Sequence, residues 1–260
     1  MALKPRILIT NDDGFFAPGI KHLWQALVDI AEVFIIAPAS EQSGVGLSLS
    51  LRNPLQIDPL QWDKNTRAWK INGTPADCVR LGVSVILKDK PDLIVSGINR
   101  GYNSGRNVLY SGTIGGVIEG VLRGIPGIAF SCGQFDDSNY ETAEKYIYTI
   151  VQHVLDVPLP HGTFLNVNFP HHPGDIKGFK LARQGKGYWV EDPDHRIHPE
   201  GKPYYWLGGK WLAHEEHDES DVALLDQGFM TAVPIHINEL TDHALLKARK
   251  YAFESLFTPN

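Results

Sequence analysis

Two adjacent carboxylates, Asp12 and Asp13, follow a short apolar run and give the first indication of chemistry in this sequence. No lysine or arginine stands beside them, so the two charges repel each other unless a divalent cation keeps both carboxylates ionised in one place. The alternative is structural, because an Asn-Asp-Asp-Gly segment can also form an Asx turn or cap a helix. This segment alone leaves a metal site and a cap equally open.

A second polar loop, APASEQSGVGLSLS, covers residues 37–50 and includes Ser43 and Gly44. A hydroxyl or amide from this loop could complete a metal shell made of oxygen atoms, although a loop of this composition is also typical of a solvated surface. Its GVG segment does not match the dinucleotide fingerprint G-x-G-x-x-G, because the third glycine is absent. The loop is therefore compatible with oxygen ligands or a solvated surface, and not with a dinucleotide site.

A third polar loop follows a buried strand and places Asn99, Asn103, Ser111 and Thr113 among closely spaced glycines. From Gly112 the chain has the apolar spacing of a helix, so the Ser-Gly-Thr backbone N–H groups and hydroxyls would face an anion at a helix N-terminus. A phosphate group fits such a position. Ser111 or Thr113 can instead be the N-cap of that helix, a role that does not exclude anion binding.

Short apolar strands separated by helical segments have to position these loops. Apolar strands without alternating polarity are buried on both faces, which predicts a doubly wound α/β core with a mostly parallel sheet over residues 1–182. Ligands of such sheets bind beyond the carboxyl ends of the strands. The predicted strands cover residues 6–10, 33–37, 92–96 and 127–131, and the helical segments cover residues 20–30, 76–85 and 113–122.

The remainder of the chain differs from this core. Residues 183–223 mix glycine, proline, aromatic and charged residues with little helical periodicity, which predicts an extended β-hairpin region. Alternating spacing predicts a return strand at 228–237, and helical spacing predicts a C-terminal helix at 242–257. Because no linker-like change in composition occurs, we predict a single domain over residues 1–260, with its extension at 183–260.

The composition excludes several classes of protein. The 260 residues include 24 basic and 30 acidic side chains, for a net charge of -6, which argues against a nucleic-acid polymer as partner. Cys78 and Cys132 have neither the spacing of a zinc site nor that of a disulfide framework. No apolar stretch has the length of a signal peptide or a membrane span. We therefore expect a cytoplasmic protein without a membrane partner.

Seven segments, taken together and in this order along the chain, resemble those of a known protein family. They are ILITNDDGFFAPGI, APASEQSGVGLSLS, INGTPADCV, PDLIVSGINRGYNSG, NVLYSGTIGGVIEG, LNVNFP and PYYWLGG. Together they resemble the SurE family, stationary-phase survival proteins that act as 5′/3′-nucleotidases. The resemblance implies a Rossmann-like core, a hairpin and C-terminal elements that exchange between subunits, and a homodimer or a dimer of dimers. It also implies a phosphomonoesterase that depends on a divalent metal.

The resemblance further implies roles for individual residues. The family's metal ligands correspond to Asp12, Asp13, Ser43 and Asn99, with one divalent ion per subunit. Such hard oxygen ligands suit Mg²⁺ or Mn²⁺, whereas zinc prefers nitrogen or sulfur. Two departures from the family, Asn107 for Asp and Ser220 for Thr, concern the range of substrates. The residues assigned to phosphate or substrate binding are Asn11, Gly44, Asn103, Ser111, Gly112 and Thr113.

We therefore expect hydrolysis of nucleoside 5′- and 3′-monophosphates, with short polyphosphate as a further candidate substrate. Asp12 and Asp13 would be catalytic, one of them accepting the proton of a metal-bound water, and a covalent aspartyl-phosphate is the competing mechanism. The alternative function is a metal-dependent nucleotide-binding or sensing module without turnover. A third hypothesis is an interaction protein that uses the aromatic extension, although such aromatics are more typical of a subunit interface.

Overall fold

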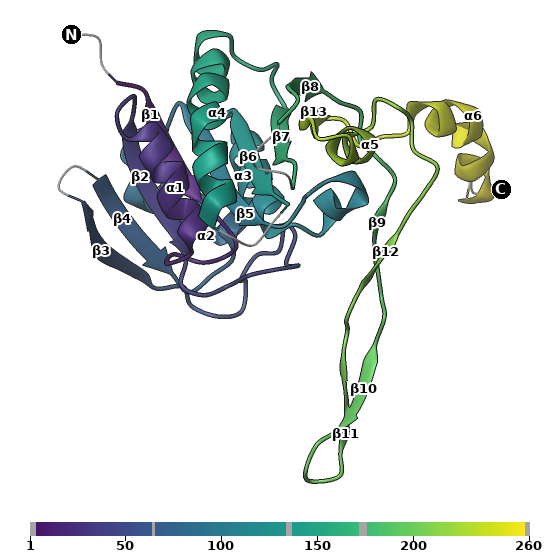
Figure 1. Ribbon diagram of the computed structural model, residues 1–260. Coiled ribbons are helices and arrows are strands. Elements are labelled where there is room, and N and C mark those ends of the chain that lie inside the picture. The colour runs from purple at the N-terminus through teal and green to yellow at the C-terminus, as the bar shows by residue number, and fades with distance from the viewer. Residues whose placement is uncertain (1–3, 64–65, 134–136, 172–175, 258–260) are drawn as a thin grey trace.

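A nine-stranded sheet with helices on both faces forms the body of the molecule in the computed structural model, which describes residues 4–63, 66–133, 137–171 and 176–257 (Figure 1). Its strands are β1 (Arg6–Thr10), β2 (Glu32–Pro38), β3 (Ile57–Asp63), β4 (Thr66–Ile71), β5 (Leu93–Arg100), β6 (Gly127–Cys132), β7 (Thr163–Phe169), β8 (Phe179–Leu181) and β13 (Met230–His236). They lie in the order β3-β4-β2-β1-β5-β6-β7-β13-β8. Only two of the neighbouring pairs, β3 with β4 and β13 with β7, are antiparallel.

The order of the strands creates one switch point. From β1 the chain moves outward to β2 and β4, and it then returns to the other side of β1 as β5 before continuing to β6 and β7. Crevices at such a reversal are the usual ligand sites of open α/β sheets. Asp12 and Asp13 directly follow β1, and Asn99 lies near the end of β5, so the topology brings these residues to one crevice.

Helices cover the sheet because each of them has one apolar face. The helices α1 (Pro18–Leu27) and α4 (Asp137–Asp156) lie on one face, and α2 (Pro75–Leu81) and α3 (Gly112–Val121) lie on the other. Successive residues of a strand point to opposite faces. Ile7 and Ile9 of β1 accordingly pack with α1 and α4, whereas Leu8 packs with α2. The central strands are thus buried on both faces, whereas the edge strands β3 and β8 are mostly exposed.

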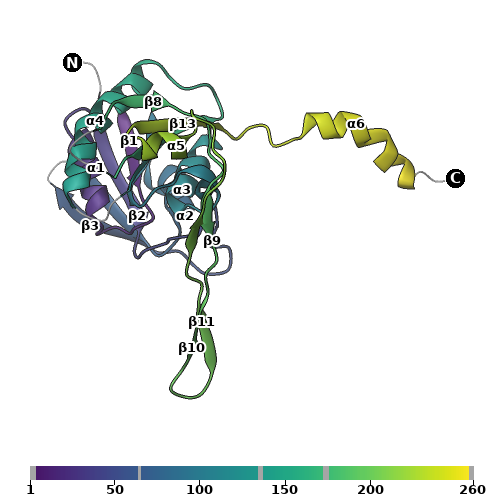
Figure 2. The ribbon, with the colours of Figure 1, turned by 45° about the vertical axis from the view of Figure 1, so that its right-hand side comes forward.

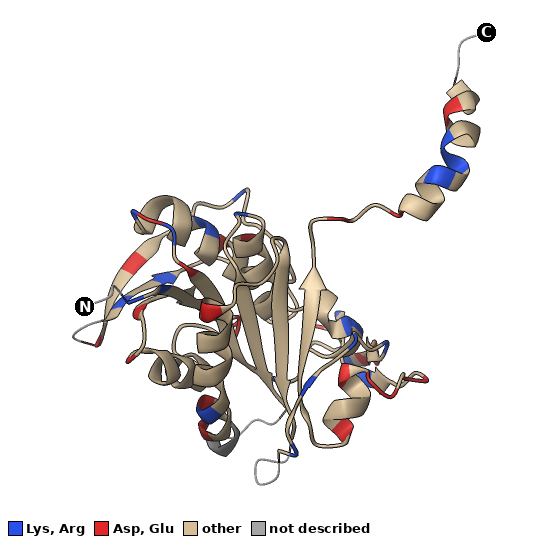
Figure 3. Cartoon of the chain, turned by 90° about the horizontal axis from the view of Figure 1, so that it is seen from above, with Lys and Arg blue, Asp and Glu red and all other residues tan. Residues whose placement is uncertain are grey.

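Two extensions leave the body (Figure 2). The first is a long hairpin, in which β9 (Tyr188–Val190) pairs with β12 (Lys210–Leu212) at the root and β10 (Asp194–Ile197) pairs with β11 (Pro203–Trp206) near the tip. After the short helix α5 (Asp221–Asp226) and β13, the chain ends in α6 (His243–Glu254) and a 3₁₀ turn, Ser255–Phe257. No residue of α6 is buried, and Figure 3 shows this helix standing clear of the body.

The structure confirms the predicted doubly wound, mostly parallel α/β fold, the hairpin region, the return strand and the C-terminal helix. The predicted helix at 76–85 is α2 followed by a π-helical turn, Gly82–Ile86. Strand β5 continues past the predicted residue 96 to Arg100, so Asn99 belongs to a strand end and not to a loop. The prediction omitted β3, β4, β7 and α4.

Two expectations based on composition concern cysteine and the membrane. Cys78 and Cys132 are not joined in a disulfide, and each is buried in a core cluster. Among the helices within the described ranges, none combines the length and the apolar run that a membrane span requires. Figure 3 also shows Lys and Arg interspersed with Asp and Glu, with no gathered basic face in that view.

Candidate functional site

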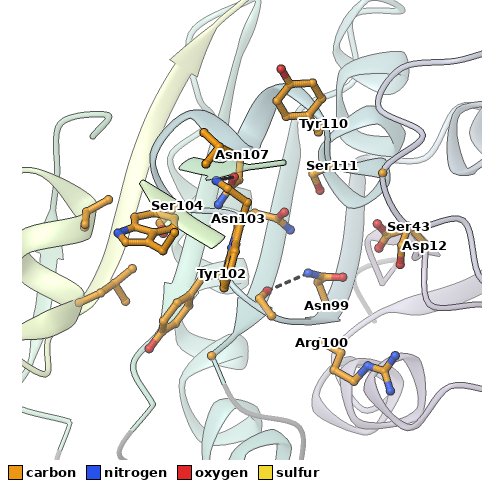
Figure 4. A pocket seen from close by; sticks show the side chains of 18 of the residues that line it. Asp12, Ser43, Asn99, Arg100, Tyr102, Asn103, Ser104, Asn107, Tyr110 and Ser111 are labelled. Atoms are coloured by element: carbon orange, nitrogen blue, oxygen red, sulfur yellow. Dashed lines mark hydrogen bonds between the residues drawn. The ribbon is translucent and has the colours of Figure 1, made fainter. Parts of the chain in front are cut away.

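A cleft of about 1000 Å³ opens at the switch point between β1 and β5 (Figure 4). It brings together side chains from the three polar loops and from the hairpin root. The sequence-predicted residues that line it are Asp12, Ser43, Gly44, Asn99, Asn103 and Ser111. The other four, Asn11, Asp13, Gly112 and Thr113, are chain neighbours of these residues or bond to them.

Asp12 is the most buried acidic group of the cleft, with 4% of its surface exposed. Its Oδ1 accepts a hydrogen bond from the Thr113 hydroxyl, and its backbone carbonyl accepts one from Gln42 N–H at 2.7 Å. Burial raises the pKa of Asp12 to about 6, the Thr113 hydrogen bond opposes this, and the neighbouring charge of Asp13 adds to it. These hydrogen bonds therefore fix the carboxylate in position. Its burial disfavours the ionised form, which a nearby positive charge would stabilise.

The rest of the loop after β1 is also held by specific contacts. Asp13 Oδ2 accepts a hydrogen bond from Arg100 N–H at 3.0 Å, and burial raises the pKa of this carboxyl too. Asn11 Nδ2 donates to the carbonyl of Gly14 at 2.8 Å, and its buried Oδ1 has no partner among the described residues. The N-cap of α1 is Ala17, so neither aspartate caps the following helix. That excludes the helix-cap alternative for this segment.

Asn99 and Ser43 present oxygen atoms to the same part of the cleft. Asn99 Nδ2 donates to the carbonyl of Gly101 at 2.8 Å, and this orientation directs its Oδ1 away from that carbonyl. In Figure 4 this oxygen is directed toward the side where Asp12 and Ser43 lie. The Ser43 hydroxyl donates to Glu41 Oε1 at 2.7 Å and so keeps lone pairs for a ligand.

These groups suit a divalent cation. The donor set comprises two carboxylates, a hydroxyl and an amide oxygen, all of them hard ligands of the kind that Mg²⁺ and Mn²⁺ prefer. The pKa values of Asp12 and Asp13 are both raised by burial, which a nearby cation would counteract. The unpartnered Oδ1 of Asn11 adds a buried acceptor beside them. The residues that are present therefore fit the metal that the sequence predicts.

The N-terminus of α3 lies against Asp12. Ser111 is the N-cap, and its Oγ accepts a hydrogen bond from Ile114 N–H at 3.2 Å, which confirms the capping role. A Cβ added at Gly112 would lie 2.8 Å from the Cβ of Asp12, so only glycine permits this approach. The first-turn N–H groups of a helix attract anions. The first turn of α3 thus stabilises the Asp12 carboxylate, through the hydroxyl and the backbone N–H of Thr113, beside the position that the sequence predicts for a phosphate.

Asn103 is locked in place by buried polar side chains from the neighbouring strands. Its backbone N–H donates to Asn168 Oδ1 at 2.9 Å, and its backbone carbonyl accepts from Asn166 Nδ2 at 2.7 Å. Its side-chain Nδ2 donates to Ser131 Oγ at 2.9 Å. The supporting residues Ser131, Asn166 and Asn168 are fully buried. They fix both the backbone and the side chain of Asn103 at the edge of the cleft.

These supporting residues were not predicted as part of the site. In the segment LNVNFP, however, two asparagines alternate with apolar residues in a buried strand, which is unusual. Buried amides need partners, and the same face of β7 places both of them toward the Asn103 loop. The alternation of asparagine with apolar residues in this segment could therefore have indicated that the two asparagines support a neighbouring polar loop.

The hairpin root forms the opposite wall of the cleft and is tied to the Asn103 loop. Buried Asp221 accepts hydrogen bonds from Gly105 N–H at 3.0 Å and from Gly185 N–H at 2.8 Å. Trp189 N–H donates to Asn107 Oδ1 at 3.1 Å. Burial raises the pKa of Asp221 despite these hydrogen bonds. Asp221 therefore connects two segments that are far apart in sequence, and its role in the site was not predicted.

Comparisons with known proteins agree with this architecture. Residues 7–191 match the family described as Survival protein SurE. The chain is 51% identical over 258 residues to the 5'-nucleotidase SurE of Protochlamydia amoebophila, covering 98% of this chain and 99% of that protein. It is 41% identical over 253 residues to the 5'-nucleotidase SurE of Aquifex aeolicus, covering 96% and 99%. The crystal structure of the SurE protein from Aquifex aeolicus superposes with a TM-score of 0.81 at 40% identity, covering 96% of this chain and 100% of that one. The chain therefore belongs to the SurE family.

Proposed function

We propose that the protein is a metal-dependent phosphomonoesterase that hydrolyses nucleoside 5′-monophosphates to nucleoside and phosphate. The observation that carries the proposal is the contact between buried Asp12 and the first turn of α3. In the proposal, the cation binds at the Asp12 carboxylate and the phosphate binds beside it, at Ser111 and Gly112. The name 5'-nucleotidase SurE, given to relatives of up to 51% identity, supports the same activity.

Asp12, Asp13, Ser43 and Asn99 would hold one Mg²⁺ or Mn²⁺. When bound, such an ion supplies a Lewis acid for a phosphoryl oxygen and lowers the pKa of a water. The two carboxylates balance the charge of the dication, and Ser43 and Asn99 add none. A dianionic phosphate can therefore enter without meeting a strongly negative site.

The remaining residues of the site would bind the phosphate and move one proton. Ser111, Gly44, Asn103 and the Gly112 N–H would bind phosphoryl oxygens as negative charge builds on them. A carboxylate oxygen of Asp12 or Asp13 accepts the proton of the attacking water while the nucleoside alkoxide leaves in line. Thr113 holds Asp12 in place through its hydroxyl. The 3′-monophosphates and short polyphosphate carry the same reacting group and are included as substrates of the proposal.

The test measures release of inorganic phosphate from nucleoside 5′- and 3′-monophosphates and from tripolyphosphate, with Mg²⁺ or Mn²⁺ and with chelator. Turnover should require the metal, and Asp13→Asn and Asn99→Ala should each lower kcat by about 100-fold or more. Asp29→Asn, at an exposed aspartate in the turn after α1, is the matched control. Metal-independent turnover, or full activity in both site variants, would contradict the proposal.

Two outcomes would favour the alternative function or the alternative mechanism. Metal-dependent nucleotide binding without phosphate release would indicate the binding or sensing module instead. A single turnover in ¹⁸O-labelled water should place the label in the phosphate if water attacks phosphorus directly. Water that attacks the phosphorus of an aspartyl-phosphate would label the product as well, so a substrate that is chiral at phosphorus separates the routes. Inversion of configuration would indicate direct attack by water, and retention would indicate the aspartyl-phosphate route.

We also propose that the hairpin and α6 pack on a second copy of this chain. Leu246, Phe253 and Phe257 of the C-terminal segment are 49%, 64% and 88% exposed, and Tyr205 and Trp206 near the hairpin tip are each 65% exposed. An isolated helix of 12 residues is marginal in water, so α6 needs a surface to cover it. Exchange of these elements in a homodimer or a dimer of dimers would supply that surface. Sedimentation at micromolar concentration that shows only a 28.9 kDa species would contradict the assembly.

A further inference from the structure

The cleft is larger than a phosphate and a metal ion require. Its volume of about 1000 Å³ extends from Asp12 and Ser111 to the hairpin root, where Trp189 and Trp211 line it. We infer that this hairpin side of the cleft is the subsite for the base of the nucleotide, formed chiefly by Trp189 and Asn107. The inference rests on the proposed function and specifies which part of the substrate the hairpin recognises.

Trp189 offers an aromatic surface that the facing strand of the hairpin supports. It pairs with Trp211 across β9 and β12, with ring centroids 6.0 Å apart and planes at 74°. The Trp211 ring packs on Gly187 so closely that an added Cβ there would collide with it. Trp189 nevertheless remains 57% exposed. An aromatic ring so placed at a cleft can stack on any base, because every base has a π-face.

Asn107 places a hydrogen-bond donor beside this surface. Its Oδ1 accepts the N–H of Trp189 at 3.1 Å, so the hairpin sets the orientation of its amide. Its Nδ2 is buried and has no hydrogen-bond partner within the described part of the chain. An unpaired buried donor is costly, and an acceptor on a base or ribose would remove that penalty. Figure 4 shows Asn107 across the cleft from Asp12 and Ser43.

The charges at the two ends of the cleft determine which way the nucleotide lies. The N-terminus of α3 is at the phosphate end, whereas Glu191 and Asp226 line the hairpin end. The carboxylates of Glu191 and Asp226 repel a dianionic phosphate but accept a neutral base. A purine covers more of the Trp189 ring than a pyrimidine does, so purine nucleotides are the preferred class.

The test compares adenosine 5′-monophosphate with ribose 5-phosphate, which has the same phosphate and sugar but no base. The unaltered protein should show a kcat/KM about tenfold or more higher for the nucleotide, and Trp189→Ala should reduce this ratio by about tenfold. Trp189→Phe should retain most of the ratio. Tyr148→Ala, which removes an exposed ring of α4 away from the cleft, is the matched control. Equal loss on both substrates in Trp189→Ala would overturn the subsite.

Calorimetric binding of adenosine separates a failure of the subsite from a failure of the proposed function. Trp189→Ala should weaken adenosine binding by about tenfold, and Asn107→Asp, which keeps the acceptor for Trp189 N–H but removes the donor, by about three- to tenfold. These results would support the subsite even if no substrate released phosphate. Unchanged adenosine affinity in both variants would overturn it even if phosphate were released normally.

Discussion

The two walls of the cleft are held in different ways. On the wall formed by β1, β5 and α3, Asp12, Asn103 and Thr113 are buried and bonded to one another or to the core strands. On the hairpin wall, Trp189 and Leu207 are exposed, and the ribbon is attached to the body at its root. One wall is part of the packed sheet, and the other is an appended strand pair.

This difference fits separate roles for the two walls, one in positioning the phosphoryl group and the other in contacting the base. Groups of a packed core cannot shift by a fraction of an ångström without disturbing their neighbours, which suits atoms that must meet a phosphoryl group in one geometry. A two-stranded ribbon is less stable and opens more readily, which suits contact with bases of different shape. Variants in the first wall should therefore alter kcat, and those in the second should alter KM and substrate preference.

Gly112→Ala should have the largest effect. The new Cβ would lie 2.8 Å from the Cβ of Asp12, so the helix end and the carboxylate must move apart. Because a displacement of about 1 Å can cost about 100-fold in rate, kcat should fall by that order. Phosphate release assays measure the change, and a circular dichroism melt checks that the variant is folded. Activity within threefold of the unaltered protein would show that the approach is not required.

Asn168→Ala should rank second, because it acts on the site through Asn103. It removes the acceptor for Asn103 N–H and the amide that donates to Asn166 Oδ1. The Asn103 N–H and Asn166 Oδ1, both buried, each lose this hydrogen bond. We expect a fall of about 10- to 100-fold in kcat/KM and a loss of about 1–3 kcal/mol in the free energy of unfolding. Asn238→Ala, an exposed asparagine, is the control. A loss of stability without any loss of kcat/KM would mean that Asn103 needs no such support.

Asp221→Asn tests the attachment of the second wall. The amide can accept fewer of the hydrogen bonds that Gly105, Gly185 and Val222 donate, so the hairpin root should loosen. KM for nucleotides should rise by about three- to tenfold with kcat nearly unchanged, and proteolysis within residues 191–209 should become faster. Asp218→Asn, exposed in the same segment, is the matched control. A fall in kcat with an unchanged KM would contradict the proposed separation between the walls.

The sequence predicted the first wall better than the second for a physical reason. Unbroken apolar runs identify β1, β2 and β6, and parallel strands bring the loops at their carboxyl ends together regardless of distance in sequence. Asp12, Ser43, Asn99 and Ser111 could therefore be grouped without knowing any contact. Local chemistry also limited the N-cap of α3 to Ser111 or Thr113, and the structure selects Ser111.

What could not be predicted depends on contacts between distant segments. Asn103 and Asn168 are separated by 65 residues, and Gly105 and Asp221 by 116, so no local pattern reveals their hydrogen bonds. Strand β3 lies at an edge and is mostly exposed, and its Pro59 is tolerated there although proline is rare within sheets. The orientation of the hairpin root over the cleft likewise follows from Asp221 and Asn107, and not from its aromatic composition.

Changes in α6 should have the smallest effect on catalysis, because this helix buries nothing against its own body. Leu246→Asp combined with Phe253→Asp would add charge to an exposed apolar face and should weaken self-association, while kcat/KM per subunit changes less than about twofold. Sedimentation measures the first effect and phosphate release the second, with Lys247→Gln as the control. If the dissociated variant lost activity, a second copy of the chain would have to complete the cleft. The comparison of the two walls would then have to count residues of the partner subunit as part of the cleft.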